Sequence, residues 1–201
     1  ESLEITAEEV TSSKTRRTYY TDEKIAAARA NIARFEWAQN DMQGAVEEAE
    51  TFLALGYEGL WNLVTPQTLP RSYAVNQELG SPITGKEIDK YGNYPWLADP
   101  VNEPWKLTDP SSGYKFPTND FGAYYRSGLD EHGIFRPELA DRSLLVNTLY
   151  PEKGETWGVD DGFGWVDENG NCWTFIAYYN HWFVWHSGQV SRAIKALRDA
   201  Y

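Results

Sequence analysis

The chain has 201 residues, of which 41% are hydrophobic and 24% charged, a composition typical of one soluble globular domain. The formal net charge is −12, which argues against nucleic acid as a partner because binding to phosphates needs a basic surface. No apolar run reaches the roughly 18 residues of a membrane-spanning helix, and the single cysteine, Cys172, excludes an intrachain disulfide and any cysteine-rich metal site.

The first quarter of the chain is predicted to be an arm followed by helices. Residues 1–20 are polar and lack periodicity, so we expect an N-terminal arm before a helical domain that spans 21–201. Thr21 has the position of an N-cap before the first helix. Apolar residues then recur at helical spacing, which predicts helices over 22–38, about 42–55 and about 60–64.

The helical pattern stops between Thr65 and Thr118, where prolines predict a long irregular insertion with small hairpins. Two segments of this insertion, SPITG at 81–85 and DPSSG at 109–113, share the form x-P-x-x-G. This is the form of a zinc-ribbon knuckle with Ser, Thr and Asp in place of the thiolates, so no structural zinc is expected. We interpret both segments as turns that hold a small hairpin layer.

Helical character returns in the second half of the chain. Helices are predicted at about 119–127 and 138–149, and an amphipathic helix at 189–201. Between them, GWVDENGNCWTF at 164–175 has two aromatic-rich runs around an Asn-Gly turn signal, which predicts a β-hairpin.

The segment YYNHWFVWHSG at 178–188 concentrates aromatic rings and histidines. On a helix, Tyr178, His181, Trp182 and Trp185 form one stripe. His181 and His186 are five residues apart, whereas a helical zinc pair needs a spacing of four, so we expect no metal here. The stripe is interpreted either as a platform for sugar rings or as core packing, with His181 bonded to a backbone carbonyl.

Two other segments contain candidate polar groups. In FPTNDFGAYYRSG at 116–128, Thr118 or Asn119 can cap a helix whose N-terminus attracts an anion, or the helix is simply capped with Arg126 reaching to water. In TWGVDDGFGWVD at 156–167, Asp160 and Asp161 diverge, so a pair of glycosidase carboxylates would need a partner such as Asp120. The same spacing does not fit a calcium loop.

Four segments occur along the chain in the order PWKLTDPSSGYKFPTNDFGAYYRSGLDEHGIF, LVNTLYPE, WGVDDGFGWVDENGN and IAYYNHWFVWH. Together they resemble the N-terminal helical part of heparinase II/III-like polysaccharide lyases, and the likeness covers roughly residues 16–201. The resemblance implies a mainly α fold, an incomplete (α/α) toroid, in a secreted or periplasmic protein. It also implies that the family's catalytic tyrosine, a later histidine and a β-sandwich lie beyond Tyr201 in a parent protein.

Members of this family cleave uronic-acid-containing polysaccharides, such as heparin, heparan sulfate, chondroitin or alginate, by β-elimination. We therefore expect no metal and no cofactor. The reaction needs a group that neutralises the uronate carboxylate, a base for the C5 proton and an acid for the departing oxygen. By resemblance, Asn180 is the carboxylate clamp, and His181 is a second donor or the base. By resemblance also, the substrate-binding residues are Tyr179, Trp182 and Trp185 as sugar platforms, and Asn119, Tyr125 and Arg126 as cleft residues.

An acidic substrate conflicts with the net charge of the chain unless basic residues gather locally. The residues that can form such a basic island are Lys86, Lys90, Lys106, Lys115 and Arg126. Two alternatives remain open at this point. One is a glycoside hydrolase on a similar toroid that uses Asp120 and Asp160, and the other is a non-catalytic carbohydrate-binding helical module.

Overall fold

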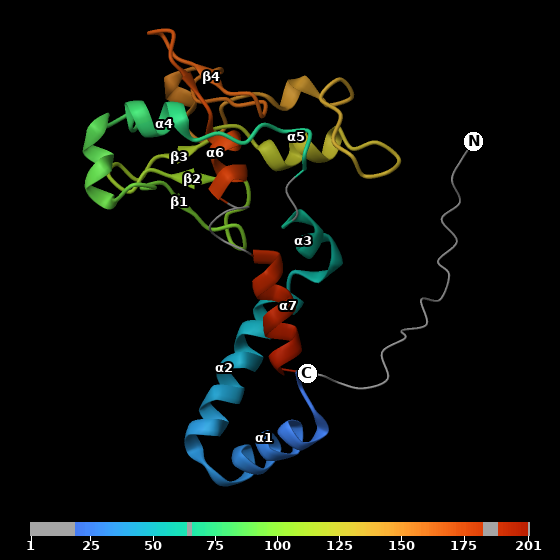
Figure 1. Cartoon of the computed structure of the whole chain (residues 1–201). Coiled ribbons are helices and arrows are strands. Elements are labelled where there is room, and N and C mark those ends of the chain that lie inside the picture. The colour runs from blue at the N-terminus through green and yellow to red at the C-terminus, as the bar shows by residue number, and fades with distance from the viewer. Residues whose placement is uncertain (1–18, 64–65, 183–188, 201) are drawn as a thin grey trace. The chain divides into compact units, whose positions relative to one another are not determined.

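The computed structural model describes residues 19–63, 66–182 and 189–200 (Figure 1). The chain is mainly helical with small antiparallel sheets, which confirms the predicted mainly α class. Within the described ranges, no helix has both the length and the apolar character needed to cross a membrane.

The chain divides into two compact units, which are described separately. One comprises residues 1–51 together with 195–201, and the other comprises residues 52–194. The single helical domain expected over 21–201 stays a prediction.

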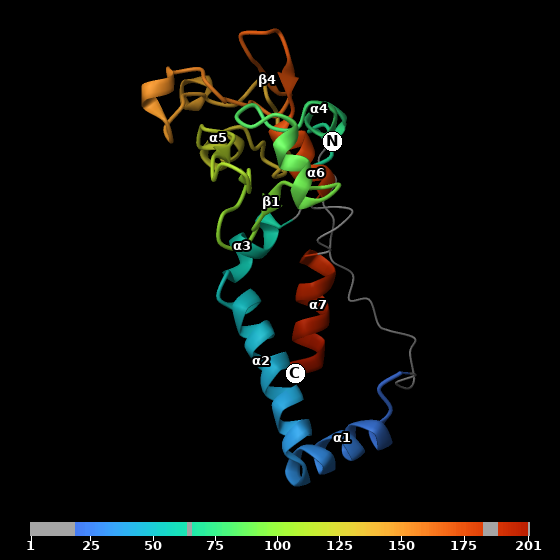
Figure 2. The same cartoon turned by 90° about the vertical axis from the view of Figure 1, so that its left-hand side faces the viewer.

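The first unit is built from α1 (Asp22–Arg34), most of α2 (Glu36–Leu53) and the end of α7 (Gln189–Ala200), which lies alongside α2 in both views (Figures 1 and 2). The Thr21 side chain accepts the backbone N–H of Lys24 at 3.4 Å, so the predicted N-cap is confirmed. Phe35 has an extended backbone (φ −124°, ψ 129°), so the first helix ends earlier, and the second begins earlier, than predicted. No residue of α1 is buried.

The second unit contains short helices separated by loops. They are α3 (Gly56–Asn62), α4 (Ala74–Leu79), η1 (Lys86–Tyr91), α5 (Phe121–Ser127), η2 (Arg142–Leu144), η3 (Pro151–Lys153) and α6 (Phe175–Trp182). The helix predicted at 138–149 was wrong, since only η2 forms there. The Asp141 carboxylate accepts the N–H and the hydroxyl of Ser143 at 2.9 and 2.6 Å, a local arrangement that competes with a longer helix.

Two small antiparallel sheets complete this unit. The first has the order β1 (Leu97–Ala98), β2 (Leu107–Thr108) and β3 (Lys115–Phe116), with Leu107 paired to Phe116. The second is the predicted hairpin of β4 (Trp165–Val166) and β5 (Cys172–Trp173). The Asp167 carboxylate closes the hairpin by accepting the Trp173 indole N–H at 2.8 Å.

The two x-P-x-x-G segments, which were interpreted as turns, are joined by hydrogen bonds to Asp109. The Ser81 and Ser112 hydroxyls donate to Oδ2 of Asp109, each at 2.6 Å, and the Thr84 hydroxyl lies 3.4 Å from the same oxygen. These four residues occupy the positions that thiolates hold in a zinc ribbon. Because a buried carboxylate is surrounded here by donors, the cluster is organised around a negative charge rather than a cation.

Asp109 is therefore expected to stabilise the insertion by holding both knuckles. Burial by itself opposes ionisation, but the hydroxyls of Ser111, Ser112 and Ser81 outweigh it and lower the pKa of this carboxyl. Asp109→Ala should lower the free energy of unfolding by about 2 to 4 kcal/mol, because the buried hydroxyl of Ser81 and the half-buried hydroxyls of Ser111 and Ser112 lose their common acceptor. Denaturant unfolding measures this loss. Asp141→Ala is the matched control, since this exposed aspartate makes similar bonds to a serine, and an equal loss in both variants would contradict the prediction.

Aromatic side chains form most of the core. Trp96 packs edge-on against Phe116, Phe175 and Tyr178, and the Phe116 and Phe175 rings stack with centroids 4.4 Å apart. These four rings are at most 1% exposed. Much of the aromatic richness of the sequence therefore stabilises the core of the second unit.

Candidate functional site

The helix α6, which carries Asn180 and His181, is anchored by the buried carboxylate of Asp160. This carboxylate accepts the N–H groups of Gly162, Gly164 and Ile176 at 2.7, 2.9 and 3.0 Å. Ile176 lies in the first turn of α6, where backbone N–H groups lack partners inside the helix. Burial raises the pKa of Asp160 to about 6, although the three N–H groups act in the opposite direction.

The loop that presents Asp160 depends on a glycine. Gly164 has a φ of +121°, which is unfavourable for residues with a side chain, and an added Cβ would lie 2.8 Å from the Cys172 sulfur. Asn119 fixes the same loop from the other side. Its amide donates to the Asp160 carbonyl at 3.1 Å and accepts the Asp160 N–H at 3.0 Å. Asn119, predicted to line a cleft, is thus buried and joins two loops.

Asn180 is enclosed within the second unit. Its side chain is fully buried, and Nδ2 donates to the Pro70 carbonyl at 3.3 Å. Its Oδ1 has no hydrogen-bond partner among the described residues. Buried polar atoms without a partner are rare and destabilising. The Asn180 amide makes only one long hydrogen bond to a described residue, so a ligand could offer it a stronger one.

His181 lies at the edge of the same helix and is only partly buried. Its ring packs against Tyr73, with centroids 4.2 Å apart and planes tilted by 45°. Tyr73 belongs to the segment 70–73, which runs along α6. Besides the bond from Asn180 to Pro70, the Ser72 N–H donates to the Ala177 carbonyl at 3.1 Å. A histidine and a tyrosine, both able to transfer protons, are therefore in contact at a partly open edge.

The sequence did not single out Tyr73. It follows Pro70 in the irregular insertion, where no periodicity links it to a helix about a hundred residues later. The one feature of the sequence that could have drawn attention to this segment is the run of two polar residues and one aromatic residue at Arg71, Ser72 and Tyr73. Their proximity to His181 comes from the tertiary fold.

The other predicted substrate-binding residues are separated from this edge or lie outside the described residues. Tyr125 and Tyr179 are at most 7% exposed and both pack on Trp105, at centroid distances of 5.0 and 5.6 Å. Their rings therefore fill the core and do not present a face to solvent. Arg126 is exposed on α5. Trp182 ends α6 but its side chain is outside the description, as is all of Trp185.

The predicted basic island is largely engaged in other interactions. Lys86 pairs with Asp89 at 3.0 Å, and Lys115 forms an ion pair with Glu103. Lys106 donates to the Pro117 and Asn119 carbonyls at 2.5 and 2.6 Å, next to the cis Phe116–Pro117 bond. Burial lowers the pKa of Lys106 to about 8. Lys90 lies over the ring of Tyr91, 5.3 Å from its centroid.

The two carboxylates considered for a hydrolase are in different environments. Asp120, not Thr118 or Asn119, is the N-cap of α5 and accepts the Ala123 N–H at 2.9 Å, while its side chain is exposed. Asp160 is fully buried, and its carboxylate oxygens accept hydrogen bonds from three backbone N–H groups. This environment is that of a structural anchor, because a catalytic carboxylate must reach the substrate.

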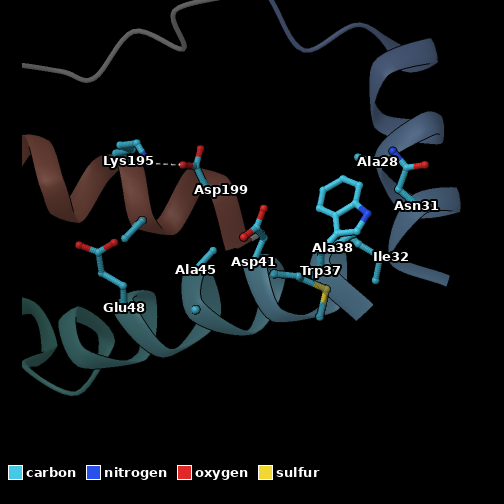
Figure 3. Close-up of a pocket in the computed structure, with 13 residues that line it drawn as sticks. Ala28, Asn31, Ile32, Trp37, Ala38, Asp41, Ala45, Glu48, Lys195 and Asp199 are labelled. Carbon is cyan, nitrogen blue, oxygen red and sulfur yellow. Dashed lines mark hydrogen bonds and ion pairs between the residues drawn. The ribbon is translucent and has the colours of Figure 1, made fainter. Parts of the chain in front are cut away.

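The first unit contains a separate apolar cleft of about 560 Å³ between α1, α2 and α7 (Figure 3). Trp37 and Met42 contribute exposed apolar surface, 59% and 43% exposed. Charged groups at the rim include the ion pair of Lys195 with Asp199 at 2.6 Å, drawn in Figure 3. The residues that line this cleft include no histidine and no tyrosine.

In the part of the chain that the structure describes, no three His, Cys, Asp or Glu side chains lie close enough together to hold a metal ion. No family model, curated protein or solved structure gave a significant match to this chain.

Proposed function

We propose that this chain is part of a polysaccharide lyase that cleaves a uronic-acid-containing polymer by β-elimination. The observation that carries the proposal is the contact between His181 and Tyr73 at a partly open edge, beside the enclosed amide of Asn180. Together these side chains supply a proton acceptor, a proton donor and a hydrogen-bond donor for a carboxylate, the three groups that the elimination needs.

In this mechanism His181 removes the C5 proton of the uronate, and the electron pair moves towards the carboxylate to form an enolate. The enolate then expels the oxygen at C4, which takes a proton from an acid such as the Tyr73 hydroxyl. The products are a C4=C5 double bond conjugated to the carboxylate and a new chain end. Asn180 stabilises the enolate through its Nδ2.

Asn180 reaches the substrate only after a local change. Its bond to the Pro70 carbonyl must be exchanged for one to the carboxylate, which needs this carbonyl to turn away from Asn180 while the Ser72–Ala177 bond and the Tyr73–His181 contact are kept. The exchange favours the bound state, because a hydrogen bond from Asn180 to an ionised carboxylate is roughly twice as strong as one to the neutral Pro70 carbonyl. Induced fit of this sort delays assembly of the site until substrate binds.

An incomplete toroid is the proposed architecture of the whole protein. The exposed apolar cleft of the first unit and the absence of buried residues in α1 support it, since helices of a toroid are covered by their neighbours. Under this proposal, further helices with the catalytic tyrosine known from the family, and a β-sandwich, belong to the same protein, which is secreted or periplasmic. Tyr73 would then act as the acid alone or share that role.

The ultraviolet absorbance of the product tests this function. The intact protein should raise the absorbance of a uronate polymer solution as the conjugated double bond forms, without added metal. The panel comprises heparosan, unsulfated chondroitin, polymannuronate and polyguluronate. New reducing ends without any absorbance would indicate hydrolysis, and binding without new chain ends would indicate a carbohydrate-binding module. Either result would overturn the lyase proposal.

A further inference from the structure

An arginine, Arg71, lies in the segment that contacts α6. Arg71 lies between two residues that contact α6, since Pro70 accepts the Asn180 amide and Ser72 donates to Ala177. Consecutive Cα atoms are about 3.8 Å apart, so the Arg71 backbone is fixed beside the helix. The next residue but one, Tyr73, packs on His181.

The positive charge of Arg71 is available to a ligand. Its side chain is exposed, and no carboxylate of a described residue forms an ion pair with its guanidinium. Two other arginines of the second unit are paired, with Arg136 3.0 Å from Asp130 and Arg142 3.5 Å from Asp161, whereas Arg126 on α5 is exposed like Arg71. In a chain of net charge −12, an exposed guanidinium two residues from Tyr73 can pair with an acidic ligand at this edge.

An aromatic face completes this edge. Tyr94 is 40% exposed and meets Tyr73 edge-to-face, with centroids 5.6 Å apart. The segment that carries it is fixed to α4 by the Gln77 amide, which donates to the Asn93 carbonyl at 3.0 Å. Tyrosine faces of this kind stack on the apolar side of a sugar ring.

We infer that Arg71 and Tyr94 form a uronate-binding subsite next to His181, in which Arg71 pairs with the sugar carboxylate and Tyr94 stacks on the ring. The inference rests on the proposed function and specifies how the acidic substrate is held. It also explains how an acidic protein binds a polyanion although Lys86, Lys106 and Lys115 are occupied. Guanidinium and carboxylate match in geometry, so the pair also orients the sugar.

The test is a double-mutant cycle between the protein and its ligand. Binding of unsulfated chondroitin and oligomannuronate hexasaccharides, and of their carboxyl-reduced forms, is measured by calorimetry on the intact protein carrying His181→Gln, which prevents turnover. Arg71→Gln should weaken binding of the acidic hexasaccharide about tenfold and leave binding of the reduced form unchanged. Arg29→Gln, at an exposed arginine of α1, is the matched control and should change neither.

Tyr94 is tested in the same assay. Tyr94→Ala should weaken binding of both ligand forms about fivefold, whereas Tyr94→Phe should retain it, because stacking uses the ring and not the hydroxyl. Unfolding temperatures of the variants report whether the fold is retained.

The outcomes separate this inference from the function on which it rests. If Arg71→Gln weakens both ligand forms equally, or neither, Arg71 does not bind the carboxylate and the subsite is rejected, while ultraviolet-active turnover by the parent protein still supports the lyase. If the parent protein yields no absorbance and binds none of the acidic hexasaccharides, the proposed function fails together with the subsite.

Discussion

Replacement of His181 by alanine is expected to lower the turnover of a uronate polymer by a factor of about 10² to 10⁴, the range that general acid–base groups contribute. The imidazole is partly exposed beside Tyr73, so its loss removes a proton acceptor without opening a large cavity in the core. The measurement is the initial rate of ultraviolet absorbance with saturating polymer. His181→Gln should be equally slow, because an amide keeps hydrogen bonds but cannot accept the proton.

The controls distinguish a chemical role of His181 from a structural one. His132 is exposed and pairs only with its neighbour Glu131, so His132→Ala should leave the rate unchanged. Unfolding of the His181→Gln variant should match that of the parent protein. Turnover within a factor of two of the parent in both His181 variants would rule out this residue as the base.

Replacement of Asp160 by alanine is expected to destabilise the second unit by about 3 kcal/mol or more. The substitution leaves three backbone N–H groups without their acceptor in a fully buried position, and each such group costs about 1 to 3 kcal/mol. One of them belongs to Ile176, so α6 loses its anchor and activity should fall with stability. Denaturant unfolding at pH 7.5 gives the magnitude.

The pH dependence of the same pair of proteins provides a second readout. Because the folded-state pKa of Asp160 is raised to about 6 from an ordinary value of 3.8, its folded form binds more protons than its unfolded form between these values. The contribution of this carboxyl to stability is therefore full at low pH and is lost as the pH rises through about 6. The difference in unfolding free energy between the parent protein and Asp160→Ala should thus be larger at pH 5.5 than at pH 7.5.

Asp161→Ala is the matched control for this prediction. The neighbouring carboxylate is less buried and accepts one N–H, from Phe163 at 3.1 Å, so its loss should cost less than about 1 kcal/mol. An equal loss in the two variants would contradict the anchoring role of Asp160, and a difference that grows from pH 5.5 to pH 7.5 would contradict its raised pKa.

The elements that depend on local rules were predicted well. Thr21 caps α1, an Asn-Gly signal marks the β4–β5 hairpin, and the helical spacing at the end of the chain corresponds to α7. Each of these depends on residues within one or two turns of each other. The prediction of a helix at 138–149 failed because its leucines do not form a buried face, with Leu139 and Leu149 58% and 41% exposed, while the Asp141–Ser143 bonds favour a short local turn.

In the candidate site, too, the sequence predicted some features and the tertiary structure decided the others. The sequence identified Asn180 as a carboxylate clamp and His181 as a second donor or base through a resemblance, but it did not predict that the two side chains differ in burial. The structure encloses Asn180 completely and leaves His181 at an edge, since consecutive residues on a helix point about 100° apart. It also assigns the rings of Tyr125 and Tyr179 to the core around Trp105.

The sequence by itself determined the chemistry that is available: an acidic, aromatic-rich chain with an amide and an imidazole side by side on a helix, and four knuckle positions without thiolates. Only the tertiary structure decided which groups meet. Tyr73 meets His181 because hydrogen bonds join Pro70 to Asn180 and Ser72 to Ala177, between segments more than a hundred residues apart. Such contacts follow from the packing of the whole unit, whereas sequence patterns record only the local preferences of the backbone.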